Sequence, residues 1–414
     1  MSGFLLAPTL TPHWAELLSF TANTQAYPCT WGLWQCGLVR FDAATLWAPA
    51  TDLVSGTQVC IIGRLVFDSA VWAQAATLPY TGGAASKLVL HRWLTQPDTL
   101  GLWLNGPACV LLYSPATEQI HLWTDRMGVY PVYTSTTQPL HLGSHPDVLA
   151  TQLKTSALDW VTLAEALGTG TSTQPYTYYQ TIHQLEPATH YTYSAADLTT
   201  TGVQTTYWQP TQPDWRGNAD IWAEQLAAAL RHCGKRRGHE PQTTVGLLLS
   251  GGADSRALLY AAAQPATVQT LTFGDGENAE IAVARQIAHA VSAPHRVLLR
   301  DFEHYGQGAW ETVRITGGHW SIKDAHYHGF QRELQALNCD SLMTGCYTDY
   351  LYKGLGYNCR PWTLAGKTLP LERLADFAPD FYQPHRRIAP HWQAQIAARS
   401  LTRIPEALRT HYRQ

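Results

Sequence analysis

The segment Ser250 to Arg256 holds the residues of this 414-residue chain that are best suited to chemistry. It reads Ser-Gly-Gly-Ala-Asp-Ser-Arg, follows the apolar run Thr244 to Leu249, and leads into a helical pattern at Ser255. Glycines let backbone N–H groups approach an anion closely, and a helix N-terminus adds partial positive charge. Hydroxyl groups and the Arg256 guanidinium can donate further hydrogen bonds to phosphate oxygens. The pattern predicts a phosphate-binding loop.

Asp254 is the residue of this loop whose charge opposes an anion. A carboxylate there suits Mg²⁺, which proteins bind through one or two carboxylates while it also contacts phosphates. We therefore expect Asp254 to hold Mg²⁺ and its neighbours to bind phosphate, namely Ser250, Gly251, Gly252 and Ser255. An ordinary strand-to-helix turn with a serine cap is the alternative, although the S-G-G-x-D-S spacing is more specific than a lone glycine pair and lacks the G-K-[ST] of a P-loop.

Strand and helix patterns alternate on both sides of this loop. Apolar strand runs occupy 244–249, 268–273, 295–299 and 341–344, and helical patterns occupy 255–263 and 280–291. This alternation predicts an α/β domain with a parallel sheet covered by helices on both faces. Asp254 follows the first strand and Asp349 the last, at the edge where such sheets bind ligands. The pair suits a shared Mg²⁺, and a turn residue is the alternative for Asp349.

The first half of the chain has a different pattern. From about residue 60 to residue 207, short β-rich runs are separated by turn residues, which predicts an antiparallel β-rich domain with some helices. The proline-containing segment 209–214 then breaks the periodicity, and a helical pattern begins at Asp220. We therefore expect two domains, 1–208 and 209–414.

Composition limits the kinds of partner. Apolar residues make up 45% of the chain and charged residues 14%, and the net charge of −3 gives no global attraction for nucleic acid. No apolar run approaches the roughly 20 residues that cross a bilayer. Eight cysteines are scattered without a C-x-x-C pair, which suits a reducing compartment. We expect a cytoplasmic protein without membrane or nucleic-acid contact, acting on a small-molecule or peptide carboxylate, with a protein partner or homodimer as further options.

The loop resembles that of the PP-loop synthetases, which cleave ATP between its α and β phosphates. The acidic loop 274–280, the helix after it and His295 are similar in spacing to the asparagine synthetase family. Residues 342–351 resemble the family's L-T-G-E-G-x-D-E-L segment, which places Asp349 on its magnesium-binding aspartate. The resemblance implies a PP-loop, adenine nucleotide α-hydrolase-like fold in which Phe273 and Gly345 also contact ATP.

The start of the chain resembles the same family's N-terminal domain. Met1 to Phe4 resembles the M-C-G-[IF] start of class II glutamine amidotransferase domains, and 125–133 resembles their D-R-x-G-x-x-P-L-Y hairpin. The resemblance implies an Ntn-hydrolase-like α+β domain. Ser2, however, replaces the nucleophilic cysteine, and a hydroxyl is a much poorer nucleophile than a thiol. We expect 1–208 to be a catalytically inactive scaffold, with an N-terminal serine hydrolase as the alternative.

Two further differences from the family concern the acceptor side of the reaction. Cys346 and Tyr350 stand where the family has two glutamates. The sequence after Asp349 is short, and Lys353 and Lys367 are its lysines, without a recognisable motif. We assign catalytic roles to Asp254, Asp349, Arg256 and Lys353, with an exposed surface lysine as the alternative for Lys353. The nearby His319, His326 and His328 are interpreted as hydrogen-bonded pocket or surface side chains rather than metal ligands.

These features favour an ATP-dependent, AMP-forming amide-bond synthetase. It would adenylate a substrate carboxylate for attack by an amine within the same substrate, as β-lactam synthetases and lasso-peptide cyclases of this family do in natural-product biosynthesis. Asparagine synthase-like amidation with glutamine or free ammonia is one alternative. A non-catalytic nucleotide-binding partner protein is another.

Overall fold

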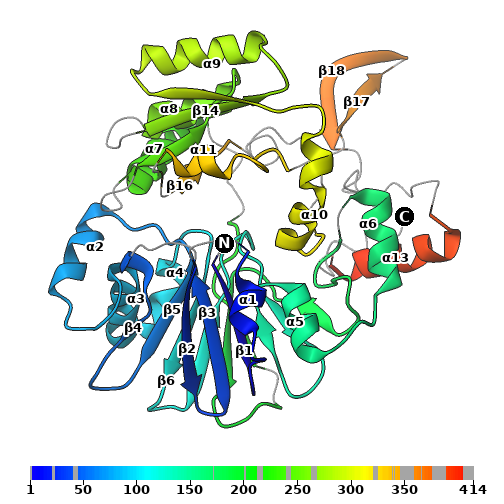
Figure 1. Ribbon diagram of the computed structural model, residues 1–414. Coiled ribbons are helices and arrows are strands. Elements are labelled where there is room, and N and C mark those ends of the chain that lie inside the picture. Colours follow the sequence, from blue (N-terminus) through cyan, green and yellow to red (C-terminus); the bar gives the residue numbers. More distant parts are fainter. Residues whose placement is uncertain are drawn as a thin grey trace.

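The computed structural model describes residues 2–20, 24–40, 45–170, 172–199, 202–211, 218–238, 244–262, 268–319, 325–337, 339, 341–345, 359–364, 366–374 and 388–403. Two bodies are visible in Figure 1: a lower one built on antiparallel sheets and an upper one built on a parallel sheet. The N-terminal end of β1 points toward the upper body.

The lower body contains two six-stranded antiparallel sheets, ordered β10-β8-β9-β1-β3-β2 and β12-β11-β7-β6-β5-β4. Its elements are β1 (Gly3–Ala7), α1 (Trp14–Leu18), β2 (Gln25–Trp31), β3 (Trp34–Arg40), β4 (Ala50–Thr51), β5 (Gln58–Gly63), α2 (Ser69–Gln74), α3 (Ala84–Thr95), α4 (Leu100–Trp103), β6 (Ala108–Ser114), β7 (Gln119–Trp123), β8 (Tyr133–Ser135), β9 (Leu142–Gly143), α5 (Pro146–Leu153), α6 (Trp160–Thr169), β10 (Ile182–Gln184), β11 (Thr189–Ser194) and β12 (Val203–Thr206).

Side-chain alternation along the strands arranges this body in four layers. Phe4 and Leu6 of β1 enter the core between the two sheets, whereas Leu5 packs on the other side with residues of α1 and α5. In the second sheet, Ile62 of β5 faces the same central core and Ile61 packs under α2 and α3. The predicted antiparallel β-rich fold with some helices is confirmed. Strand β1 is buried on both faces, so it lacks the alternation by which a half-exposed strand is recognised.

The upper body carries the predicted parallel sheet, ordered β15-β14-β13-β16. Its elements are α7 (Ala219–Gly238), β13 (Val245–Leu248), α8 (Ala253–Ala262), β14 (Val268–Gly274), α9 (Ala279–Ala290), β15 (His295–Leu299), α10 (His304–Thr316), α11 (Gln331–Gln335) and β16 (Ser341–Met343), followed by the hairpin β17 (Cys359–Leu364) and β18 (Lys367–Leu374) and by α13 (Pro390–Arg403). Leu247 and Leu249 face α8 and α9, and Leu248 faces the side of α11. Helices therefore cover both faces of the sheet, as expected.

Side chains from the upper body and α13 make contacts with the lower body. After α10, His319 stacks on Tyr178 with ring centroids 4.7 Å apart, and the Tyr178 hydroxyl donates to the Gly318 carbonyl at 2.6 Å. On α7, the Arg236 guanidinium lies 3.1 Å from a carboxylate oxygen of Asp68. Helix α13 lies beside α6 of the lower body (Figure 1). The two bodies are thus joined by side-chain contacts as well as by the chain itself.

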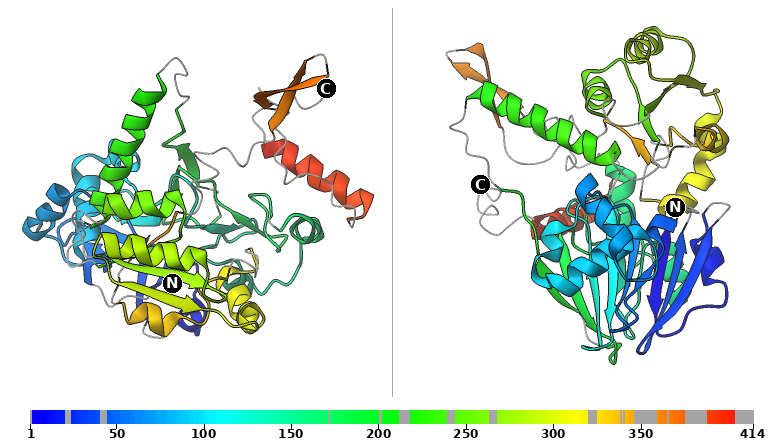
Figure 2. Two further views of the ribbon diagram at one scale, coloured as in Figure 1. Left: turned by 90° about the horizontal axis from the view of Figure 1, so that it is seen from above. Right: turned by 90° about the vertical axis from the view of Figure 1, so that its left-hand side faces the viewer.

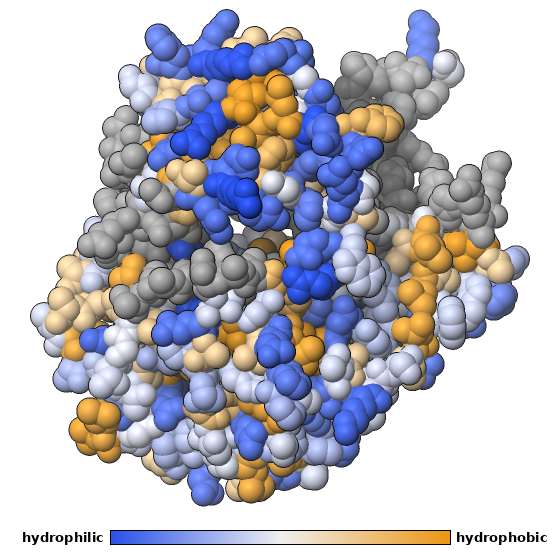
Figure 3. Space-filling view, in the orientation of Figure 1, coloured by the Kyte–Doolittle hydropathy of each residue, from blue (hydrophilic) through white to orange (hydrophobic). Residues whose placement is uncertain are grey.

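Some apolar side chains remain on the surface. Helix α7 projects to the side in both views of Figure 2, and Ile221 and Trp222 near its start are exposed. The space-filling view shows further apolar side chains over α6, where Trp160 and Leu167 are exposed (Figure 3). Within the described residues, none of the helices combines the length and hydropathy that a bilayer crossing requires.

Candidate functional site

Hydrogen bonds between Ser250 and Ser255 hold the two ends of the loop between β13 and α8 together. The Ser255 hydroxyl donates to the Ser250 carbonyl at 3.1 Å and lies 2.9 Å from the Ser250 hydroxyl. The Gly252 N–H donates to the Ser250 hydroxyl at 3.2 Å. Because Ser255 is buried and hydrogen-bonded inside the loop, it shapes the turn that brings the backbone N–H groups to one place.

A cavity of about 400 Å³ opens beside this loop, at the carboxyl ends of the parallel strands. It is lined by Leu248, Leu249, Ser250, Gly252, Asp254, Ser255, Leu271, Thr272, Phe273, Glu280, Arg300, His326, Tyr327, Thr344 and Gly345. Most of the predicted nucleotide-binding residues are therefore brought together around a single cavity.

Two predicted loop residues are placed elsewhere. Gly251 packs against α9, where a Cβ built on it would lie 3.6 Å from atoms of Glu280 and Val283. Arg256 is exposed, and its Nε donates to the Gly252 carbonyl at 3.3 Å. Neither is among the lining residues. In this structure Arg256 therefore braces the start of α8 from outside, rather than pointing its charge into the cavity.

The end of β16 closes the cavity from the side opposite β14. A Cβ built on Gly345 would lie 3.4 Å from the Cβ of Asp254, so the segment after β16 runs directly beside the start of α8. A site shared by the carboxyl ends of β13 and β16 requires the segments that follow these strands to lie this close together. Asp349 and Lys353, with Cys346 and Tyr350, lie outside the described residues. Lys367 is exposed at the start of β18.

Among the other lining residues, Arg300 and Tyr327 were not assigned to the site from sequence, and His326 is one of the histidines expected to be a hydrogen-bonded pocket or surface side chain. Arg300 directly follows β15, and its Nε lies 2.8 Å from Asp275, the residue that follows β14. The carboxyl-end rule that selected Asp254 would also have selected Arg300. No periodicity points to Tyr327, whose ring meets that of Phe273 at a centroid distance of 5.2 Å.

In the lower body, the hairpin that follows Asp125 reaches the N-terminus. The Asp125 carboxylate accepts hydrogen bonds from the N–H groups of Met127, Val129 and Tyr130 at 2.7–3.0 Å. Burial nevertheless raises its pKa. The turn fixed in this way directs the Tyr130 hydroxyl to the Ser2 carbonyl, to which it donates at 2.7 Å. The turn after Asp125 thus fixes the backbone at Ser2 through the Tyr130 hydroxyl.

Another charged side chain lies deep in this body and was missed by sequence reasoning. Arg40, at the end of β3, is 2% exposed, and its Nη1 donates to the Ile61 carbonyl of the facing sheet. Cys109 of β6 is also fully buried, and burial raises its pKa well above the usual range. A thiol held in its protonated form is a weak nucleophile.

Comparison with known families agrees with both bodies. Residues 81–208 match the glutamine amidotransferase domain, and residues 225–315 match asparagine synthase. The two matches fall on the four-layer body and on the parallel sheet with its glycine loop, and they support an ATP-dependent carbon–nitrogen ligase of amidotransferase type. Both matches support assignment of the chain to the asparagine synthetase family.

Two solved structures are similar to the chain. One is glutamine phosphoribosylpyrophosphate amidotransferase from B. subtilis complexed with ADP and GMP, with 10% identity, coverage of 86% of this chain and 93% of that chain, and a TM-score of 0.37. The other is described as the allosteric regulatory enzyme of purine biosynthesis, with 10% identity, coverage of 94% and 99%, and a TM-score of 0.37. Comparison with curated proteins gives no match.

Proposed function

We propose that this chain uses MgATP to adenylate a substrate carboxylate and passes the acyl group to an amine of the same substrate. The carboxylate oxygen would attack the α-phosphorus and expel pyrophosphate. The amine would then attack the acyl carbon, lose a proton and expel AMP. A β-lactam synthetase-like or lasso-peptide cyclase-like role in natural-product biosynthesis is the form of this reaction that the chain fits best.

The observation that supports adenylation is the convergence of Ser250, Gly252, Asp254 and Gly345 on one cavity at the strand ends. The loop N–H groups are suited to hold the leaving pyrophosphate, and the start of α8 adds partial positive charge. The oxygen donor of Asp254 suits a hard cation, so Asp254, with Asp349, would hold Mg²⁺, which neutralises charge on the phosphates. Catalysis would then consist mainly of positioning and charge neutralisation.

The use of an internal amine is supported by the first body. Ser2 lacks the thiol that glutamine hydrolysis needs, and its carbonyl is fixed by Tyr130. A chain that cannot release ammonia from glutamine needs another source of nitrogen, and an amine within the substrate supplies it. The lower body then serves as a scaffold for the cytoplasmic enzyme.

Pyrophosphate exchange tests the proposal. We expect the wild-type chain to catalyse ATP–[³²P]pyrophosphate exchange with at least one carboxylate of a panel of β-amino acids, amino diacids and peptides. Asp254→Ala should lower exchange at least 1,000-fold, whereas Asp220→Ala, the same change at an exposed site on α7, should leave it within twofold. ATP binding without exchange for every carboxylate would favour a non-catalytic nucleotide-binding protein instead.

A further inference from the structure

The cavity beside the loop is lined by two chemically different groups of residues. Ser250, Gly252 and Asp254 belong to the loop, and Phe273 and Tyr327 form an aromatic pair. The sheet order places β15 two strands from β13, or about 10 Å across the sheet at the usual strand spacing. A nucleotide whose phosphates lie on the loop would therefore extend its base toward β14 and β15, where flat rings are available for stacking.

Next to the ring of Tyr327, three side chains form a closed hydrogen-bonded group. The Arg300 Nη1 lies 2.7 Å from the Tyr305 hydroxyl and 3.2 Å from Nδ1 of His326. The Tyr305 hydroxyl also lies 2.8 Å from the same Nδ1. Asp275 fixes the guanidinium from the other side, and the Tyr305 ring lies under it with its centroid 5.6 Å away.

This arrangement determines which nitrogen of His326 carries the proton. A guanidinium has donors only, so Nδ1 must be the acceptor of the Arg300 hydrogen bond. The imidazole proton then sits on Nε2, and His326, which lines the cavity, offers an N–H donor. The positive charge of Arg300 is balanced by Asp275. A single N–H donor beside the ring of Tyr327 suits an uncharged acceptor, such as a ring nitrogen of a purine, better than it suits a second phosphate.

We propose that His326 reads the base of ATP by donating its Nε2–H to a ring nitrogen of adenine, in a subsite walled by Phe273 and Tyr327. Arg300 and Tyr305 are positioning residues that hold the imidazole in the donating tautomer. The proposal rests on the proposed function, because it takes ATP as the occupant of the cavity. It adds the recognition of the base, at the opposite end of the nucleotide from the pyrophosphate loop.

The test measures the affinity of the full-length chain for ATP and for its 1-deaza, 3-deaza and 7-deaza analogues, with Mg²⁺ and without carboxylate, by titration calorimetry. Each analogue lacks one ring nitrogen. We expect one of the three analogues to bind about three- to tenfold more weakly than ATP, because it loses one net hydrogen bond. The other two should bind within twofold of ATP. His326→Phe keeps a ring but removes the donor, so it should weaken ATP by the same factor and bind ATP and all three analogues alike.

The Tyr305→Phe variant distinguishes a role of Tyr305 in orienting the His326 ring from a role in stabilising the fold. It removes only the hydroxyl, so it should reduce the discrimination between ATP and the weak analogue while the thermal unfolding midpoint stays close to that of the wild type. If the wild-type chain binds all three analogues as well as ATP, or if His326→Phe still discriminates, the base-reading role is wrong. If His326→Phe binds ATP normally but raises the KM of the carboxylate, the donor faces that substrate, and the proposal is again wrong. A wild-type chain that binds no ATP at all would instead overturn the proposed function.

Discussion

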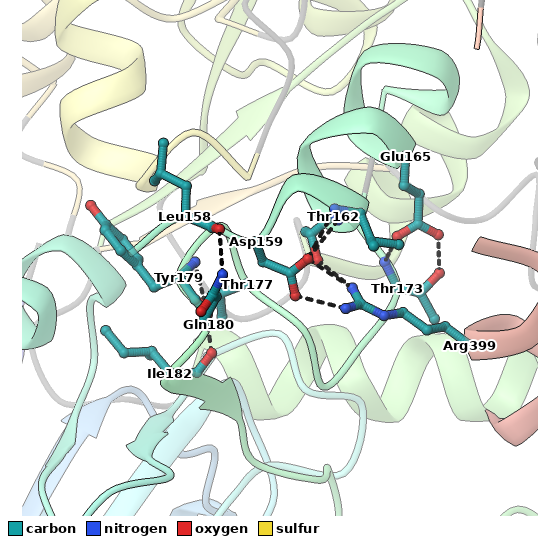
Figure 4. A network of polar contacts seen from close by, with 11 residues as sticks. Leu158, Asp159, Thr162, Glu165, Thr173, Thr177, Tyr179, Gln180, Ile182 and Arg399 are labelled. Carbon is teal, nitrogen blue, oxygen red and sulfur yellow. Dashed lines mark hydrogen bonds and ion pairs between the residues drawn. The ribbon is translucent and has the colours of Figure 1, made fainter. Parts of the chain in front are cut away.

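Arg399 of α13 forms a two-point ion pair with Asp159, at 3.1 Å from Nη1 to Oδ1 and 2.9 Å from Nη2 to Oδ2 (Figure 4). Asp159 also caps α6, because its Oδ1 accepts hydrogen bonds from the N–H groups of Val161 and Thr162. The guanidinium lies over the ring of Tyr176 at 4.1 Å. The Asp159 carboxylate therefore caps α6 of the lower body and also binds α13, which follows the upper body in the chain.

Substitutions at Asp159 should separate these two roles. Asp159→Asn keeps a capping oxygen but loses the charge, and because both partners are largely buried we expect it to lower the free energy of unfolding by about 2 kcal/mol. Asp159→Ala loses the cap as well and should cost about 1 kcal/mol more. Urea unfolding of both variants and of Arg399→Ala provides the comparison. If Asp159→Asn unfolds like the wild type, the ion pair does not hold α13 in place.

The loop serines should differ in their effects. Ser255→Ala removes the buried hydroxyl that binds the Ser250 carbonyl, so the turn itself should loosen, and exchange activity should fall by about 100-fold. Ser250→Ala leaves the Ser255 bond in place and should cost about tenfold. Pyrophosphate exchange at saturating ATP measures both. The reverse order would mean that the Ser250 hydroxyl contacts the reacting phosphates more directly than the loop closure suggests.

Ser2→Ala should leave ligase activity within twofold of the wild type, because it keeps the backbone carbonyl that accepts the hydrogen bond from the Tyr130 hydroxyl. Amide formation from substrate and ATP is the readout, with glutaminase activity measured in parallel. Tyr130→Phe serves as the control: it removes the hydroxyl that binds the Ser2 carbonyl and should lower stability by about 1 kcal/mol. Ammonia release from glutamine that disappears in Ser2→Ala would contradict the scaffold role.

Acid should destabilise the lower body through a buried histidine pair. Nδ1 of His121 lies 3.1 Å from Nε2 of His190, and the His190 ring stacks on Trp123 at 4.2 Å. Burial lowers the pKa of both histidines to about 4. An unfolded chain titrates near 6.5, so between pH 6.5 and 4 it binds more protons than the folded chain, and the free energy of unfolding falls as the pH falls. Each histidine contributes at about 1.4 kcal/mol per unit of difference in pKa, so we expect a loss of several kcal/mol between pH 7 and 4.

Unfolding measured at pH 7, 5.5 and 4 tests this prediction. His190→Phe keeps a ring on Trp123 but cannot bind a proton, so the dependence on pH should flatten. His13→Phe alters a histidine that is 74% exposed and should leave the slope unchanged. A wild-type slope that His190→Phe does not reduce would place the acid sensitivity elsewhere in the chain.

The sequence predicts the upper body well because its signals are local. Strand β13 is a short apolar run because it is buried between helices, and the glycines after it form the turn. The order of strands and helices then places Asp254 and Gly345 at one edge without any knowledge of side-chain contacts. The antiparallel body is identified from β-rich runs between turns and from the D-R-x-G-x-x-P hairpin, although β1, buried on both faces, shows no pattern of its own.

Contacts between residues far apart in the chain are not predictable in this way. Arg300 and His326 meet because β15 and the segment before α11 pack on the same end of the sheet, and neither residue belongs to a spaced motif. The pairing of Arg399 with Asp159 spans 240 residues and depends on where α13 comes to rest. Periodicity describes which face of an element is apolar, and it does not say which partner covers that face.

The docking of α13 and α10 on the lower body also limits how such a protein can evolve. A domain without a catalytic role is ordinarily free to accumulate substitutions or to be deleted. Here Asp159 and Tyr178 complete the packing of segments that belong to the ligase half. A gene that discarded the lower body would leave Arg399 and His319 without these partners, so the contacts keep the domain under selection whether or not it hydrolyses glutamine.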